Sequence, residues 1–140
     1  MAANDTERTI REYLNALEAR GDFASFFADD VLWTTMETGD ENRGREAVTG
    51  FIVALHTEWF DASPEFGSVT VTDGVAGLEA VFVGTHIGDF AGVPATRAEV
   101  RFPYSVFYDI ADGQITALRA YFPLGRMVQQ LQEAAGVVPA

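Results

Sequence analysis

Residues 98–122 read AEVRFPYSVFYDIADGQITALRAYF, and this stretch decides the fold. Its Asp112-Gly113 pair stands between two runs rich in β-branched and aromatic residues, which is the strongest short signal for a β-hairpin in the chain. The pattern predicts two long antiparallel strands, 98–108 and 114–122, joined by a turn over 109–113.

Side chains alternate between the two faces of a strand, so the hairpin has one nearly apolar face on which Tyr104 is the only polar group. The opposite face carries Glu99, Arg101, Ser105, Arg119 and Tyr121. We expect the function of the protein to lie over the apolar face, whose members are Val100, Phe102, Tyr104, Val106, Leu118, Ala120 and Phe122.

Outside the hairpin, apolar residues at helical spacing predict helices near 4–20, 23–27, 45–60 and 124–131. Three further strands are predicted at 31–37, 69–72 and 75–86, and residues 38–45 are predicted to form a polar loop. In strand 75–86, Ala80, Phe82 and His86 share a face. The order of elements indicates one α+β domain, residues 1–140, with a mostly antiparallel sheet that can enclose a cavity beneath its helices.

Composition excludes several kinds of chemistry. The formal charge of −12 argues against binding to nucleic acids or to an anionic membrane surface. The chain has no cysteine, and all nine basic residues are arginine, which excludes thiolate and Schiff-base chemistry. Two histidines far apart give no metal-ligand spacing, so we expect no metal and no organic cofactor. No secretory or membrane-spanning pattern is present, and we expect a cytoplasmic protein.

Three segments resemble a known family. Residues 44–48 (GREAV) are similar to the start of the third helix of the NTF2-like superfamily, and residues 84–96 (GTHIGDFAGVPAT) resemble a segment of its SnoaL-like polyketide cyclase, or ester cyclase, branch. Residues 112–122 resemble the closing hairpin that this branch shares with limonene-epoxide hydrolases. The resemblance implies a cone, in which a strongly curved sheet wraps around N-terminal helices and encloses a deep apolar pocket. It also implies a homodimer that packs through the outer face of the sheet.

The resemblance does not extend to the acid and base groups that the cyclases and the epoxide hydrolases use for catalysis. Where the cyclases and the hydrolases have an aspartate on the last strand, this sequence has Ala120. At the two hydrolase positions on the long strand, where an arginine and a second aspartate are expected, it has Ala80 and Phe82. Trp33 and Thr35 stand where a tyrosine and an asparagine of the hydrolase pocket are expected.

Two residues are the main candidates for catalysis. His86 lies on the pocket-facing side of strand 75–86, where an imidazole can exchange protons near neutral pH; alternatively, it bonds the loop backbone and shapes the turn. The Tyr104 hydroxyl can donate to an enolate or carbonyl oxygen, or it can line the pocket without a catalytic role. His56 can point inward or outward from helix 45–60, and Glu37 can be a base at the pocket rim or a solvated strand end.

The predicted substrate site combines the apolar hairpin face with the helix that covers it. Small residues at Ala80, Gly84 and Ala120 are expected to leave volume for a ligand. The predicted substrate-binding residues are Trp33, Thr35, Phe51, Leu55, His56, Trp59, Phe82, Phe102, Val106, Leu118, Ala120 and Phe122.

Two functions of different kinds fit these observations. One is a cofactor-independent cyclase or isomerase that acts on a small hydrophobic substrate, polyketide-like or terpenoid-like, in the apolar pocket. The other is a protein that binds a hydrophobic metabolite without turning it over. An epoxide hydrolase is a third possibility, although no group predicted here would activate water.

The apolar part of the expected homodimer interface would consist of Val81, Val83, Phe107 and Tyr121.

Overall fold

The computed structural model describes residues 2–136 and contains a single curved sheet with three α-helices. The elements in chain order are α1 (Ala2–Glu18), η1 (Phe23–Phe26), β1 (Phe27–Thr35), β2 (Asp40–Arg43), α2 (Arg45–Val53), η2 (Ala54–Glu58), β3 (Phe60–Ala62), β4 (Glu65–Thr72), β5 (Val75–His86), β6 (Glu99–Ala111), β7 (Gln114–Tyr121) and α3 (Leu124–Ala134).

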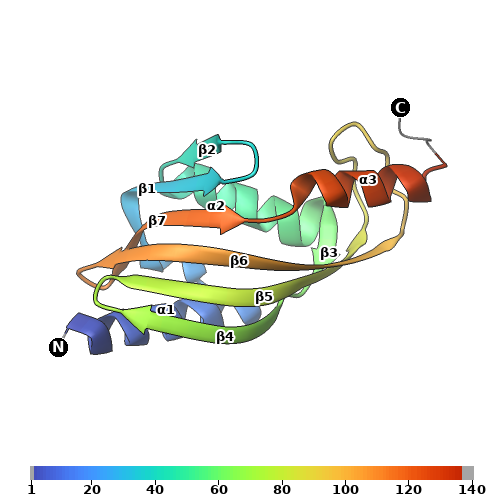
Figure 1. Cartoon of the computed structure of the whole chain (residues 1–140). Coiled ribbons are helices and arrows are strands. Elements are labelled where there is room, and N and C mark those ends of the chain that lie inside the picture. Colours follow the sequence, from blue (N-terminus) through green and yellow to red (C-terminus); the bar gives the residue numbers. More distant parts are fainter. Residues whose placement is uncertain (1, 137–140) are drawn as a thin grey trace.

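The strand order is β2-β1-β7-β6-β5-β3, and β4 also pairs with β5. The β1–β7 pair is parallel and the other pairs are antiparallel, which confirms the predicted α+β class with a mostly antiparallel sheet. Helices α1 and α2 lie behind the sheet in the view of Figure 1, and α3 extends from the end of β7. The sheet and the two helices therefore enclose the core between them.

The predicted hairpin is present as β6 and β7, but its turn is shorter than expected. Asp112 (φ 53°) and Gly113 (φ 74°) form a two-residue loop with both φ angles positive, the geometry that suits the twist of a hairpin. Because two residues are enough to reverse the chain, β6 continues to Ala111 instead of ending at Tyr108. In the resulting register, Tyr108 lies opposite Leu118, on the inner face of the sheet.

The predicted alternation of faces is confirmed by burial. In β5 the buried residues are every second one, from Ala76 to His86. Phe82 pairs with Phe102, and Ala80 pairs with Tyr104, so the inner faces of β5 and β6 coincide.

Three expectations about local structure are corrected. The polar segment 38–45 contains β2, which pairs with β1 through its backbone and needs no apolar alternation. The helix expected near 4–20 runs from Ala2 to Glu18. The helix expected over 45–60 changes to a π-helical turn at Ala54 and ends at Glu58, because β3 begins at Phe60.

No helix among residues 2–136 is both long and apolar enough to cross a membrane.

Candidate functional site

A small cavity of about 30 Å³ lies between the concave face of the sheet and the helices. Its wall includes residues from α1, α2, η2 and five strands. They are Tyr13, Leu17, Trp33, Ile52, Leu55, His56, Phe66, Leu78, Phe82, Tyr104, Val106, Tyr108, Ala120 and Phe122. We call this space the inner cavity.

The inner cavity brings together eight of the residues that the sequence placed in the site: Trp33, Leu55, His56, Phe82, Tyr104, Val106, Ala120 and Phe122. The other six, which are Thr35, Phe51, Trp59, His86, Phe102 and Leu118, do not line it. The inward side predicted for strands 75–86, 98–108 and 114–122 was therefore correct, but position along the strand decides which inward residues reach the cavity.

The cavity is smaller than the deep pocket that the resemblance implied. Aromatic rings fill much of the space beside Ala120: Phe82 and Phe122 lie edge to face with ring centroids 5.2 Å apart, and Tyr104 lies 5.4 Å from Phe122. A volume of 30 Å³ holds a group no larger than one or two water molecules. Only a small part of any ligand fits here without rearrangement.

Three tyrosine hydroxyls from α1 and β6 belong to the cavity wall. Tyr13, Tyr104 and Tyr108 have no hydrogen-bond partner among residues 2–136. Burial raises the pKa of each phenol above its usual value, and the neighbouring phenols raise the pKa of Tyr13 and Tyr108 further. The three hydroxyls are therefore protonated at neutral pH and available as hydrogen-bond donors.

His56 is held in one orientation by the π-helical turn η2, a type of irregularity that is frequent at functional sites. Its Nδ1 lies 2.8 Å from the carbonyl oxygen of Ile52. A carbonyl oxygen only accepts, so Nδ1 carries the proton and Nε2 has the free lone pair. Burial lowers the pKa of His56, the hydrogen bond to Ile52 raises it, and the charge of Arg20 lowers it, with a net decrease. The ring is thus a neutral base at the wall of the cavity.

His86 lies elsewhere in the core. It is fully buried, and Nδ1 accepts the backbone N–H of Thr96 at 3.1 Å, with the Thr96 hydroxyl 3.0 Å away. Because Nδ1 accepts, Nε2 carries the proton, and Nε2 has no hydrogen-bond partner among residues 2–136. The ring packs on Phe60, with centroids 5.3 Å apart. His86 thus connects β5 to the loop before β6.

The remaining predicted polar groups also have structural partners. Trp33 Nε1 donates to the Thr35 hydroxyl at 3.0 Å, so these two residues satisfy each other. Glu37 is exposed and accepts the backbone N–H of Gly125 at 2.9 Å, at the start of α3.

Phe51, Trp59 and Phe90 continue an aromatic row from Trp33, with successive ring centroids 5.1, 5.7 and 5.3 Å apart. The row joins Trp33, in the wall of the inner cavity, to the loop before β6, and its other three members do not line the cavity.

A second and larger space lies on the helix side of the molecule. This outer groove, of about 410 Å³, runs between the end of α1, η1, α2–η2 and residues 62–64. Leu17, Ile52 and His56 line both the outer groove and the inner cavity. The His56 ring therefore stands between the two spaces.

Two cavity tyrosines were missed by the sequence analysis. Tyr13 was not singled out from the helix predicted near 4–20, although a tyrosine among the apolar residues of a helix brings a hydroxyl into the core. Tyr108 was assigned to the end of its strand, but alternation continued from Tyr104 and Val106 predicts that it faces inward.

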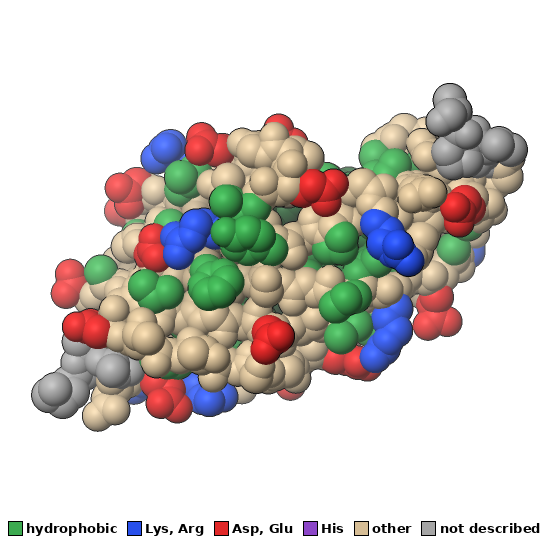
Figure 2. Space-filling model, viewed as in Figure 1, with side chains coloured by type: hydrophobic (Ala, Val, Ile, Leu, Met, Phe, Trp, Pro, Cys, Tyr) green, Lys and Arg blue, Asp and Glu red, His purple; other side chains and the backbone are tan. Residues whose placement is uncertain are grey.

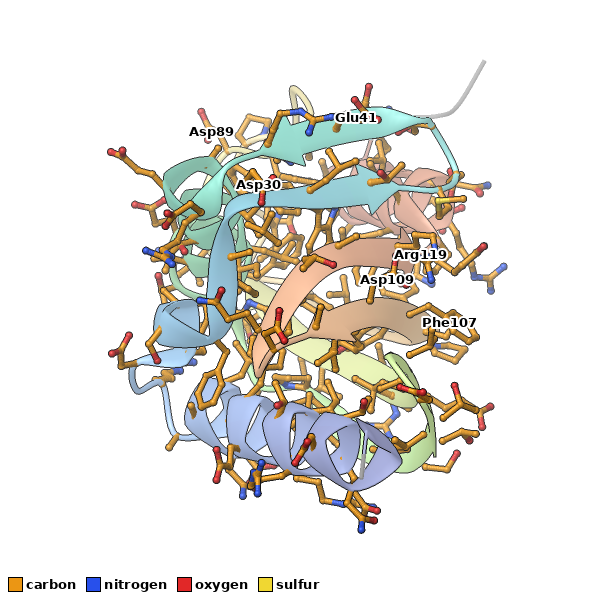
Figure 3. All side chains as sticks on the ribbon, turned by 90° about the vertical axis from the view of Figure 1, so that its left-hand side faces the viewer. Asp30, Glu41, Asp89, Phe107, Asp109 and Arg119 are labelled. Carbon is orange, nitrogen blue, oxygen red and sulfur yellow. The ribbon has the colours of Figure 1, made fainter. Side chains whose placement is uncertain are left out.

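The outer face of the sheet is partly apolar. Phe107 and Tyr121 are 41% and 48% exposed and lie edge to face, 6.0 Å apart. Hydrophobic side chains gather over the strands on this face in Figure 2. Asp109 and Arg119 form a two-point ion pair at 2.7 and 3.0 Å beside Phe107, and Figure 3 shows these three residues on the side of the sheet away from α1.

Among residues 2–136, no three His, Asp or Glu side chains are grouped closely enough to hold a metal ion. The groups available for chemistry at the inner cavity are therefore the His56 imidazole and the tyrosine hydroxyls.

The curved sheet closed over α1 and α2 is the NTF2-like cone of the α+β class. A family model for SnoaL-like polyketide cyclases matches residues 5–131, and the chain belongs to this family. No curated protein matches the sequence.

Solved structures share the fold at low sequence identity. A protein described as a SnoaL-like polyketide cyclase, from Jannaschia sp. CCS1, has a TM-score of 0.82 and 19% identity over 99% of this chain and 96% of its own. A protein described as a ketosteroid isomerase, from Kribbella flavida DSM 17836, has a TM-score of 0.68 and 18% identity over 86% and 79%. An NTF2-like protein from Burkholderia pseudomallei K96243 has a TM-score of 0.74 and 15% identity over 91% and 97%.

Proposed function

We propose that this protein is a cofactor-independent cyclase or isomerase that acts on a small hydrophobic carbonyl compound, with His56 as the general base. The observation that carries the proposal is the orientation of His56, whose Nδ1–H is bound to the Ile52 carbonyl and whose Nε2 is unprotonated. The names of two similar structures, a polyketide cyclase and a ketosteroid isomerase, both refer to keto compounds.

The first step is removal of a proton from the carbon next to the substrate carbonyl. Nε2 of His56 takes the proton, the C–H electron pair forms a carbon–carbon double bond, and the carbonyl π electrons move to oxygen. The result is an enolate and an imidazolium. The hydroxyl of Tyr104 donates a hydrogen bond to the enolate oxygen, and a donor placed at a developing negative charge contributes strongly to catalysis.

The second step decides the reaction type. If the substrate has a carbon–carbon double bond next to the deprotonated carbon, the enolate is a dienolate; return of the proton from the imidazolium to its γ carbon then moves the double bond, and the reaction is an isomerisation. If the enolate carbon attacks another carbonyl of the same molecule, a ring forms, and the imidazolium protonates the new alkoxide. Both courses leave His56 neutral at the end and need no cofactor.

His86, the other histidine, has no part in this proposal because it lines neither the inner cavity nor the outer groove. The aspartate that the cyclases carry on the last strand is replaced here by Ala120. The base is thereby assigned to η2 on the helix side of the cavity, opposite the strand that usually supplies it.

Deuterium exchange into a simple ketone tests the proposal without knowledge of the substrate. α-Tetralone in D2O, followed by NMR, should lose its α-proton signal faster with the protein than with buffer. His56→Gln should slow the catalysed exchange by about 10²–10⁴-fold, the usual contribution of a general base. Glu46→Gln, on an exposed position of α2, is the matched control and should not change the rate.

The alternative function is binding of a hydrophobic metabolite without turnover, which the small number of ionisable groups at the cavity favours. If the protein accelerates exchange of neither α-tetralone nor any molecule that copurifies with it, the alternative is correct and the enzymatic proposal is wrong.

We also propose that the protein acts in the cytoplasm as a homodimer joined through the outer face of the sheet.

A further inference from the structure

The outer groove has the size and surface of a ligand site. Its volume of about 410 Å³ is within the range of small-molecule pockets, whereas the inner cavity is too small for a whole ligand. Apolar side chains form much of its wall, with Leu17, Phe23 and Ala24 on one side and Ile52 and Val53 on the other. A hydrophobic molecule of modest size can therefore lie between the two helical segments.

The outer groove and the inner cavity are adjacent and share part of their walls. Leu17, Ile52 and His56 border both spaces, and the edge of the His56 ring faces Phe82 at a centroid distance of 5.9 Å. A ligand group that moved from the groove into the inner cavity would pass between these three shared side chains. Because the inner cavity holds only about 30 Å³, the part that passes His56 is limited to one small group, such as a carbonyl.

The charges around the groove select a neutral ligand. Among residues 2–136, Arg20 is the only basic residue in its wall, and it is already engaged with Asp61 at 3.1 Å and the Ala62 carbonyl oxygen at 3.0 Å. Glu18 and Asp22 add negative charge to the same wall. An anionic ligand would meet an excess of carboxylates here, and the described part of the wall has no other arginine to offset their repulsion.

One residue of the groove wall has an unsatisfied polar group. Thr49, on α2, lines the groove, and its hydroxyl oxygen is buried with no hydrogen-bond partner among residues 2–136. A buried hydroxyl without a partner is costly, and an oxygen or nitrogen atom of a ligand that displaced the groups covering it would satisfy it.

We propose that the outer groove binds the body of the substrate, a neutral and largely apolar small molecule, and that only its carbonyl end passes His56 into the inner cavity. The identity of the reacting end rests on the proposed function, whereas binding in the groove does not. The recognition surface is thus the helix side of the molecule and not the interior of the cone.

Dye binding tests this assignment. The neutral dye N-phenyl-1-naphthylamine should bind with increased fluorescence, and its anionic analogue 1-anilinonaphthalene-8-sulfonate should bind about tenfold more weakly or not at all. Thr57→Trp, which fills the groove, should weaken binding of the neutral dye by about tenfold or more. Thr38→Trp is the matched control, because both threonines are exposed and each donates one side-chain hydrogen bond. Equal affinities in the two variants, or preference for the anionic dye, would overturn the proposal.

Methyl NMR locates the dye directly. With ¹³C-methyl alanine, the neutral dye should shift the signals of Ala24 and Ala62, which line the groove, more than the signal of Ala120, which lines the inner cavity. A shift confined to Ala120 would place the ligand inside the cone and contradict the inference.

The two proposals fail in different ways. If dye binding behaves as described but α-tetralone exchange is not catalysed, the groove is a ligand site and the enzymatic function is wrong. If His56-dependent exchange is as fast in Thr57→Trp as in the unchanged protein, the enzymatic function stands and the groove assignment is wrong.

Discussion

Nδ1 of His56 lies 2.8 Å from the carbonyl oxygen of Ile52, the residue four positions earlier on the same helix. This hydrogen bond determines which ring nitrogen is protonated and leaves Nε2 as the basic atom. The π-helical turn Ala54–Glu58 gives the helix one extra residue at this point, and the ring lies at the boundary between the inner cavity and the outer groove. The backbone around His56 therefore fixes the tautomer of its ring, and the basic Nε2 atom makes His56 the base of the proposed site.

Acid should destabilise the protein through His56. Its pKa is lower in the folded protein than the ordinary value of 6.5, because burial and Arg20 disfavour the imidazolium. The unfolded chain therefore binds the proton more readily, and the free energy of unfolding should decrease as the pH falls from 6.5 through the lower pKa of the folded state. Urea unfolding between pH 7.5 and 5 measures this loss.

His56→Gln is the control for the acid effect. A glutamine does not titrate, so the variant should lose less stability over the same pH interval than the unchanged protein. Equal losses would show that groups other than His56 cause the pH dependence.

Enlarging Ala120 should destabilise the fold. Its side chain is 1% exposed and borders a cavity of about 30 Å³, which is too small for an added aromatic ring. Ala120→Phe should therefore cost about 1–3 kcal/mol of unfolding free energy by overpacking. Ala47→Phe, at an exposed position of α2, should change stability much less. An unchanged midpoint for Ala120→Phe would mean that the cone opens to a larger pocket.

Loss of the Tyr104 hydroxyl should affect catalysis more than folding. Tyr104→Phe keeps the ring that packs on Phe122 and removes only a hydroxyl without a partner among residues 2–136. The thermal midpoint should change little, whereas α-tetralone exchange should slow by about 10²-fold or more, as for loss of an oxyanion donor. Unchanged exchange would remove Tyr104 from the proposed mechanism.

The outer face of the sheet should be a dimer interface. Phe107 and Tyr121 expose large apolar side chains beside the Asp109–Arg119 ion pair, and such a patch is typical of an interaction surface. Sedimentation at micromolar concentration should give twice the chain mass of 15.2 kDa, and Phe107→Asp should give the monomer. Val53→Asp, at a position of similar exposure on the helix side, should remain a dimer. A monomer before any substitution would refute the interface.

The sequence predicted the strands better than the site. The Asp-Gly turn and the alternation of apolar residues were sufficient to place β5 and the inner face of β6, because both signals depend on neighbouring residues. Strand β2 was missed, because Asp40–Arg43 is polar throughout and its pairing with β1 depends on the backbone.

The direction of His56 and the size of the cavity could not be predicted from the same patterns. A π-helical turn contains more residues than an α-helical turn and has no distinctive sequence. The His56 ring could therefore equally be expected to point into the protein or toward solvent. The volume beside Ala120 depends on how the rings of Phe82, Tyr104 and Phe122 pack together, and this packing is not visible in alternation alone.

The tautomers of the two histidines give the most direct test of the central claim, that His56 presents an unprotonated Nε2 to the cavity. The chain has only two histidines, so long-range ¹H–¹⁵N NMR of ¹⁵N-histidine-labelled protein resolves both rings. At pH 8, His56 should be protonated at Nδ1 and His86 at Nε2, because one donates to Ile52 and the other accepts from Thr96. A spectrum in which both rings are protonated at Nε2 would contradict the account.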